Sequence, residues 1–208
     1  MDPYSALTHL ECSRCRHTYD ATVLAGLCQD CSAPLLARYD LNQVTVDPDE
    51  LARRPPNLWR YHQLLPVSAP EHVVSLGEGM TPMLALPRLG TELGLSRLLV
   101  KDEGQLPTGS FKARGAAVGV SRARELGATA LAMPTNGNAG AAWAAYAARA
   151  GLRMVVAMPT DAPVVTRAEV VATGAELRLA EGRISDAGRL VATLVADDPT
   201  LTDVATLK

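Results

Sequence analysis

The sequence of 208 residues has little of what nucleic-acid-binding or membrane-spanning proteins need. Aromatic residues make up only 4% of it, which disfavours a surface on which bases stack. Its 20 basic and 22 acidic residues are interleaved, so no strongly basic face is expected. The most apolar window, at residues 140–150, is too short to cross a bilayer. We therefore expect neither a nucleic-acid partner nor a membrane partner.

The N-terminus also lacks the features of an export signal. Residues 1–5 carry no basic group and no apolar run. We therefore expect a cytoplasmic protein, in which thiols stay reduced and paired cysteines are metal ligands before they are disulfides. The apolar content of 48% and the charged content of 20% are ordinary for a globular chain that can bury its own core.

All four cysteines fall within residues 1–38, as two C-x-x-C pairs. Cys12 pairs with Cys15, and Cys28 pairs with Cys31. Two such pairs facing each other supply a tetrahedral four-sulfur zinc site with no open ligand position, so the zinc would be structural. The spacing between the pairs is slightly short for this motif, and unligated or redox-active thiols are the alternative. We predict a zinc ribbon here.

The rest of the chain divides into two parts that differ in proline content and in the pattern of apolar residues. Residues 39–72 are rich in Pro, which interrupts helices and strands, and we expect a linker or an arm wrapped on a neighbour. From residue 73 on, short apolar runs alternate with helical patterns. Strands are expected at 97–101, 130–133, 153–158, 175–179 and 201–205, and helices at 110–126, 139–150, 163–173 and 185–196. This alternation predicts an α/β fold with a parallel sheet of βαβ units.

Two loops of this region hold candidate functional residues. Lys112 follows a Pro-Thr-Gly turn and the chain's only Phe, and small residues that would let a flat ligand approach follow it. A solvated surface lysine is the commoner interpretation of such a residue. The second loop, at residues 134–140, follows a strand at the edge of the sheet where ligands bind in α/β proteins. Its backbone N–H groups could hold an anion, although Asn-Gly also makes good turns unaided.

Together these residues resemble fold-type-II enzymes that use pyridoxal 5′-phosphate (PLP), and most closely the threonine synthases with an N-terminal zinc ribbon. The resemblance covers residues 57–208 closely and the ribbon more loosely. The matching segments are 76–82, 100–104, 107–115, 137–140 and 144–151, with 204–208 just before the family's next block. The lysine and asparagine loops in this order are a specific signal, whereas either loop alone would be weak.

The resemblance implies a cofactor, a reaction and roles for residues. Lys112 would hold PLP as a Schiff base and shuttle the proton of the substrate Cα, and Asn138 would contact the ring hydroxyl. The reaction implied is O-phospho-L-homoserine plus water giving L-threonine plus phosphate. Family analogy also suggests a homodimer. The residues assigned to the α-carboxylate of the substrate are Thr135, Asn136, Gly137 and Ala139, and those assigned to a substrate phosphate are Lys101 and Ser110.

Two departures from the family qualify this interpretation. Ala113 stands where many relatives have Asp. The family's loop for the cofactor phosphate and its group facing the pyridine nitrogen come later than residue 208. Residues 73–208 are therefore expected to be the N-terminal part of a catalytic region, in a chain that is a fragment. The alternatives are a threonine or serine dehydratase, a cysteate- or diaminopropionate-forming synthase, or a non-catalytic truncated module.

Overall fold

The computed structural model describes residues 3–205. Its N-terminal part is a small antiparallel sheet. Strand β1 (Leu7–Cys12) lies between β2 (Thr18–Asp20) and β3 (Leu35–Tyr39). Cys12 and Cys28 are buried in its core. The sheet extends one residue past the expected boundary at 38, and the division of the chain at residues 38 and 72 stays a prediction. Residues 206–208, the end of the expected catalytic region, lie outside the described residues.

The Pro-rich segment is packed on the protein as an arm. Trp59 and Val67 are buried in the main core. Asp40, Asp47 and Asn57 each accept a hydrogen bond from the backbone N–H two residues on, which caps the start of a short helix. The elements of the arm are η1 (Leu41–Gln43), α1 (Pro48–Arg53), η2 (Leu58–Leu64) and η3 (Pro70–His72).

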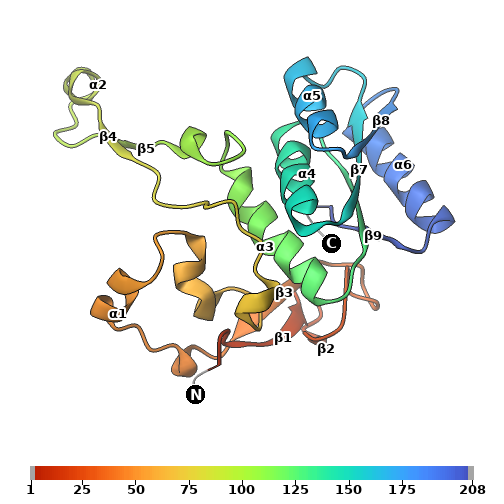
Figure 1. Cartoon of the computed structure of the whole chain (residues 1–208), viewed down its shortest axis with the longest axis horizontal. Helices are drawn as coiled ribbons and strands as arrows, with labels where there is room; N and C mark the ends of the chain where they lie inside the picture. The colour runs from red at the N-terminus through yellow and green to blue at the C-terminus, as the bar shows by residue number, and fades with distance from the viewer. Residues whose placement is uncertain (1–2, 206–208) are drawn as a thin grey trace.

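A two-stranded sheet projects from the body of the molecule (Figure 1). In it, β4 (Met83–Ala85) pairs antiparallel with β5 (Leu99–Lys101), and α2 (Pro87–Glu92) lies between them in the chain. The expectation that the strand at 97–101 opens the parallel sheet is therefore wrong. Every residue of β5 is exposed, whereas a strand inside a parallel sheet is buried on both faces.

The main sheet is parallel and has four strands, in the order β8-β7-β6-β9. Its strands are β6 (Ala130–Pro134), β7 (Arg153–Pro159), β8 (Glu176–Ala180) and β9 (Leu201–Asp203). The helices that connect them are α4 (Asn138–Ala150), α5 (Val164–Ala172) and α6 (Ile184–Asp197). The predicted parallel sheet of βαβ units is confirmed. Within residues 3–205, no helix is both long and apolar enough to cross a membrane.

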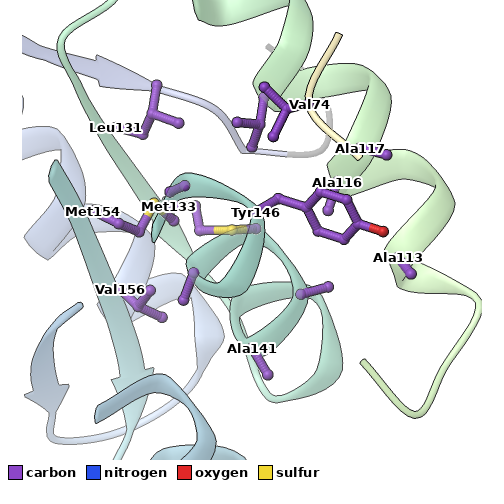
Figure 2. Packing of buried hydrophobic residues seen from close by; sticks show 14 of the residues in the cluster. Val74, Ala113, Ala116, Ala117, Leu131, Met133, Ala141, Tyr146, Met154 and Val156 are labelled. Carbon is purple, nitrogen blue, oxygen red and sulfur yellow. The ribbon is translucent and has the colours of Figure 1, made fainter. Parts of the chain in front are cut away.

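Side chains of the main sheet alternate between two cores, as the period of two in a strand requires. Leu131 and Met133 pack in the larger core with α4, while Ala130 and Ala132 pack in a smaller core with α6. Figure 2 shows the larger core, in which the ring of Tyr146 lies against the small residues of α3 (Lys112–Glu125). Helices α3 and α4 thus pack side by side (Figure 1).

The strand order creates a switch point at β6. From β6 the chain adds β7 and then β8 on one side, and it returns to place β9 on the other side of β6. Helices α4 and α6 accordingly cover opposite faces of the sheet. In open α/β sheets, ligands bind outside the carboxyl end of the strands at such a point. The loop that follows β6 occupies that position.

Candidate functional site

Lys112 is the first residue of α3, and a sharp turn presents it. Gly109 has φ +64°, a left-handed conformation that glycine adopts readily, and it turns the chain between η4 (Glu103–Gln105) and the helix. The Lys112 side chain is half-buried, and its Nζ lies 4.2 Å from the centre of the Phe111 ring. Ala113 is fully buried among apolar residues, so an Asp at this position would bury a charge.

The side chain of Thr135 stabilises the loop after β6 through hydrogen bonds. Its Oγ1 accepts hydrogen bonds from the N–H groups of Gly137, at 3.1 Å, and Gly140, at 3.3 Å. Gly137, at the N-cap of α4, has no side chain to do this, so the Thr135 hydroxyl acts as the cap instead. The backbone N–H groups of Asn138 and Ala139 open the helix, where such groups have no intrahelical partner and can bind an anion.

Lys112 and this loop line one pocket of about 380 Å³. Its lining residues are Lys112, Thr135, Asn136, Gly137, Asn138, Ala139, Pro163 and Thr166. Six of these were predicted site residues. Pro163 and Thr166 were missed, although they follow β7, whose carboxyl end neighbours that of β6 in the parallel sheet.

The two residues assigned to a substrate phosphate lie elsewhere. Ser110 does not line the Lys112 pocket, although it is buried and its Oγ has no hydrogen-bond partner among the described residues. Lys101 lines a second pocket, of about 440 Å³, and its Nζ donates to the carbonyl of Thr81 at 2.7 Å. This second pocket is lined by Asn57, Leu58, Arg60, Tyr61, Gly79, Met80, Lys101, Glu103 and Arg114.

A paired carboxylate stands in the second pocket. Arg114 donates to both oxygens of Glu103, from Nε at 2.6 Å and from Nη2 at 2.9 Å, and Thr81 Oγ1 adds a third donor at 2.6 Å. These bonds, that from Arg114 first, lower the pKa of Glu103 to about 2. Glu103 therefore stays ionised at neutral pH, and its negative charge neutralises the positive charge of Arg114.

Glu78 is a buried junction that sequence reasoning missed. It is fully buried and accepts hydrogen bonds from Trp59 Nε1 at 2.9 Å, Ser75 Oγ at 3.0 Å and Leu76 N at 3.0 Å. Tyr146 of α4 donates to it at 2.5 Å, and burial together with this bond raises the pKa of Tyr146. One carboxylate thus joins the arm, the loop before β4 and α4. The only available signal was its place in the matched segment 76–82, which gave no role.

The four cysteines converge at the end of the N-terminal sheet. Their Sγ atoms, those of Cys12, Cys15, Cys28 and Cys31, all lie within 4.8 Å of one another. Two of the Sγ pairs, Cys12 with Cys31 and Cys15 with Cys28, are 3.5 Å apart. Zn–S bonds of about 2.3 Å in a tetrahedron place sulfurs about 3.8 Å apart, whereas a disulfide needs about 2.05 Å. The four thiols therefore fit a zinc ion.

Donors around the thiols support that fit. The N–H groups of Arg14 and Cys15 point to Cys12 Sγ at 3.4 Å. The Tyr19 hydroxyl donates to Cys28 Sγ at 3.1 Å, and this bond is the main cause that lowers the pKa of the Cys28 thiol to about 6. Metal binding requires the thiolate form, which these donors favour at Cys12 and Cys28. Burial and hydrogen bonds to neighbouring thiols instead raise the pKa of Cys15 and Cys31.

The Lys112 pocket likewise offers a donor set that fits PLP. It combines a half-buried primary amine, the exposed amide of Asn138 and the N–H groups that open α4. An amine is what an aldehyde group requires, and the helix start suits a carboxylate. The pocket lies at the switch point of the sheet.

Comparisons with known proteins agree with this geometry. Residues 74–206 match the model of the pyridoxal-phosphate dependent enzyme family. Threonine synthase of Methanosarcina acetivorans is 37% identical over 191 residues, covering 91% of this chain and 47% of the relative. Threonine synthase of Methanocaldococcus jannaschii is 37% identical over 189 residues, covering 89% of this chain and 46% of the relative. The chain spans about half the length of these relatives.

Solved structures of related fold cover the same part. A pyridoxal 5′-phosphate-dependent aspartate racemase is 28% identical, with a TM-score of 0.55, over 60% of this chain and 39% of that one. Apo diaminopropionate ammonia lyase of Escherichia coli shares the fold, with a TM-score of 0.58 and 24% identity, over 62% of this chain and 39% of that one. With more than half of its length inside the family model, the chain belongs to the pyridoxal-phosphate dependent enzyme family.

Proposed function

We propose that the chain forms one wall of the active site of a threonine synthase, a lyase that converts O-phospho-L-homoserine and water into L-threonine and phosphate. The observation that carries the proposal is that Lys112 and the loop 135–139 share one pocket at the switch point of the sheet. The threonine synthase of Methanosarcina acetivorans matches 91% of this chain, which supports the same substrate class. An amino-acid substrate suits any PLP enzyme, and the phosphorylated homoserine is the finer proposal.

The proposed roles follow from the family resemblance, and the shared pocket supports those of Lys112, Asn138 and the loop around it. Lys112 would hold the cofactor through its amine and would later move the proton at the substrate Cα. Asn138 would donate its amide to the ring hydroxyl. PLP, when bound, supplies an electron sink for the bonds at Cα. Thr135, Asn136, Gly137 and Ala139 would surround the substrate carboxylate. For Ser110 and Lys101, which lie outside the Lys112 pocket, the contact to the substrate phosphate is proposed from the family resemblance alone.

The cysteine cluster has a structural role in this proposal. Four thiolates complete the shell of a zinc ion and leave no position for a substrate. We propose that the protein works in the cytoplasm, where thiols stay reduced and able to bind metal. A homodimer remains a proposal by analogy with the family.

The test is phosphate release from O-phospho-L-homoserine by the whole protein with PLP, followed together with threonine formation. We expect both products in equal amounts, and neither from the Lys112→Ala variant. Serine and threonine are assayed as alternative substrates, because their deamination without phosphate release would indicate a dehydratase. A folded, PLP-loaded protein that releases no phosphate would contradict the proposal.

A further inference from the structure

The segment that presents Lys112 is closed at its two ends by an ion pair. Glu103 is the first residue of η4 and Arg114 is the third residue of α3, so the pair joins positions eleven residues apart. The Gly109 turn and Lys112 lie between them. The Arg114 guanidinium contacts both oxygens of Glu103, from Nε and from Nη2. Such a fork fixes the direction as well as the distance between the two ends.

The start of α3 has few other contacts that set its orientation. Within residues 3–205 no side chain caps it, and Phe111 at the N-cap has no oxygen to offer. Two of its backbone bonds are of the tight i→i+3 kind, to the carbonyls of Ser110 and Phe111, each at 3.2 Å. Ala113 packs in the main core, but a methyl group gives no directional contact. Arg114 therefore supplies the directional side-chain contact that this turn otherwise lacks.

Lys112 and Arg114 lie on opposite sides of this first turn. Lys112 lines the pocket with the loop 135–139, whereas Arg114 lines the second pocket. Residues two apart in a helix point about 200° away from each other. A rotation of the turn that moved Arg114 off Glu103 would therefore also swing Lys112 away from the loop.

The carboxylate of Glu103 is itself fixed by two other segments. Thr81 Oγ1, in the loop before β4, donates to it at 2.6 Å. The carbonyl of Thr81 accepts a bond of 2.7 Å from Lys101 Nζ at the end of β5, and this ammonium group also attracts Glu103. Arg114 is attracted in turn by the buried carboxylate of Glu78. Two cations and two carboxylates thus balance one another, and the cluster holds α3 against β5 and the loop before β4.

We propose that Glu103 and Arg114 are positioning residues for Lys112, and that their pair holds the first turn of α3 in the orientation that presents the Lys112 amine to the pocket. This role rests on the proposed function, in which Lys112 carries PLP. An ion pair that served stability alone could join any two segments, whereas this one brackets the segment of Lys112. Its loss should therefore impair PLP binding more than it impairs folding.

PLP binding by the whole protein, measured without turnover, tests this role. We expect Glu103→Gln and Arg114→Gln each to weaken PLP binding about tenfold or more, because a displaced amine meets the aldehyde less readily. The absorbance band of lysine-bound PLP should fall in parallel. The double variant should bind no more weakly than the weaker single variant, since residues that act through one contact are not additive. Arg114→Lys, which keeps the charge but not the fork, should recover part of the affinity.

Glu125→Gln is the matched control. It removes an ion-paired carboxylate from the other end of the same helix, where Arg122 donates to it. We expect this variant to have a lower melting temperature and the PLP affinity of the wild type. The melting temperature is measured for every variant, so that an effect on folding is separated from an effect on PLP binding.

Two results would overturn the inference. They are wild-type PLP affinity in both Glu103→Gln and Arg114→Gln, and a loss of affinity no larger than that in Glu125→Gln. If Arg114→Gln does not fold, because buried Glu78 loses the cation that attracts it, Glu103→Gln decides alone. PLP binding that Lys112→Ala abolishes and both pair variants keep refutes this role and leaves the proposed function standing. A wild type that binds PLP through Lys112 but releases no phosphate refutes the proposed reaction alone.

Discussion

Gly140 shows how one residue determines the packing behind the loop that lines the Lys112 pocket. A Cβ atom at this position would lie 2.4 Å from Thr135 Cγ2 and 2.8 Å from Val156 Cγ1. The missing side chain therefore lets α4 approach β6 and β7, and it lets the Thr135 hydroxyl reach the helix start. Gly140 lies in the first turn of α4, and the close packing around it explains why a residue without a side chain stands there.

Replacing Gly140 by Ala should destabilise the protein by about 1–3 kcal/mol, because the added methyl group overpacks the core. Gly188→Ala is the control, since Gly188 lies in α6 with no atom within 4 Å of the new Cβ. That change should stabilise the protein by about 0.5–1 kcal/mol through helix propensity. Urea denaturation of the two variants measures both effects. Equal effects of the two substitutions would show that Gly140 is not closely packed.

Glu103 should make stability depend on pH in a defined window. Its carboxyl has a pKa of about 2 in the folded protein against an ordinary 4.5, so the unfolded chain binds the proton more readily. The stabilisation is fully present above 4.5 and is lost as the pH falls toward 2. The difference in unfolding free energy between the wild type and Glu103→Gln should therefore shrink over that range, as denaturant titrations at a series of pH values would measure. A difference that does not change with pH would rule out the charged pair with Arg114.

At the scale of elements, the main sheet and its helices could be predicted from the sequence, since apolar runs and helical patterns alternate there. The exposed strand β5 was predicted as a strand but was placed in the wrong sheet, because three residues carry too little pattern to show which strand they pair with. Glu78 could not be found, because its donors Trp59 and Tyr146 lie 19 and 68 residues away along the chain.

The junction at Glu78 should couple α4 to the arm. Tyr146→Phe removes one of the four donors to a fully buried carboxylate, which should cost about 1–3 kcal/mol. Tyr61→Phe, at a tyrosine that is 47% exposed, is the matched control and should change stability by less than about 0.5 kcal/mol. Thermal unfolding of both variants measures the difference. A Tyr146→Phe variant as stable as the control would show that the bond contributes little.

At the scale of the whole molecule, Arg122 joins α3 to the ribbon and the arm. It donates to the carbonyl of Ala21 beside β2, and it also pairs with Glu125, which accepts from Ser68 of the arm. The helix that begins with Lys112 is therefore held at its far end by the cysteine-bearing part of the chain. Disorder in that part should weaken the support of α3.

Zinc removal should accordingly lower the stability of the whole chain. We expect one zinc ion per chain by elemental analysis, and a melting temperature that falls by at least about 5 °C with a chelator, at about 2–4 °C per kcal/mol for this size. In Cys12→Ser, which lacks one ligand, the chelator should have little further effect. Wild-type protein that is free of zinc, with reduced thiols and unchanged melting, would contradict the metal site.

Borohydride trapping tests directly whether Lys112 carries the cofactor. The protein is loaded with PLP and reduced, which fixes the cofactor to the lysine that carries it, and the peptides are mapped by mass spectrometry. We expect the added mass on Lys112, which lines the pocket with Asn138, and its loss in Lys112→Ala. The same labelling in Lys112→Ala, or a label on Lys101 or Lys208 in the wild type, would contradict it.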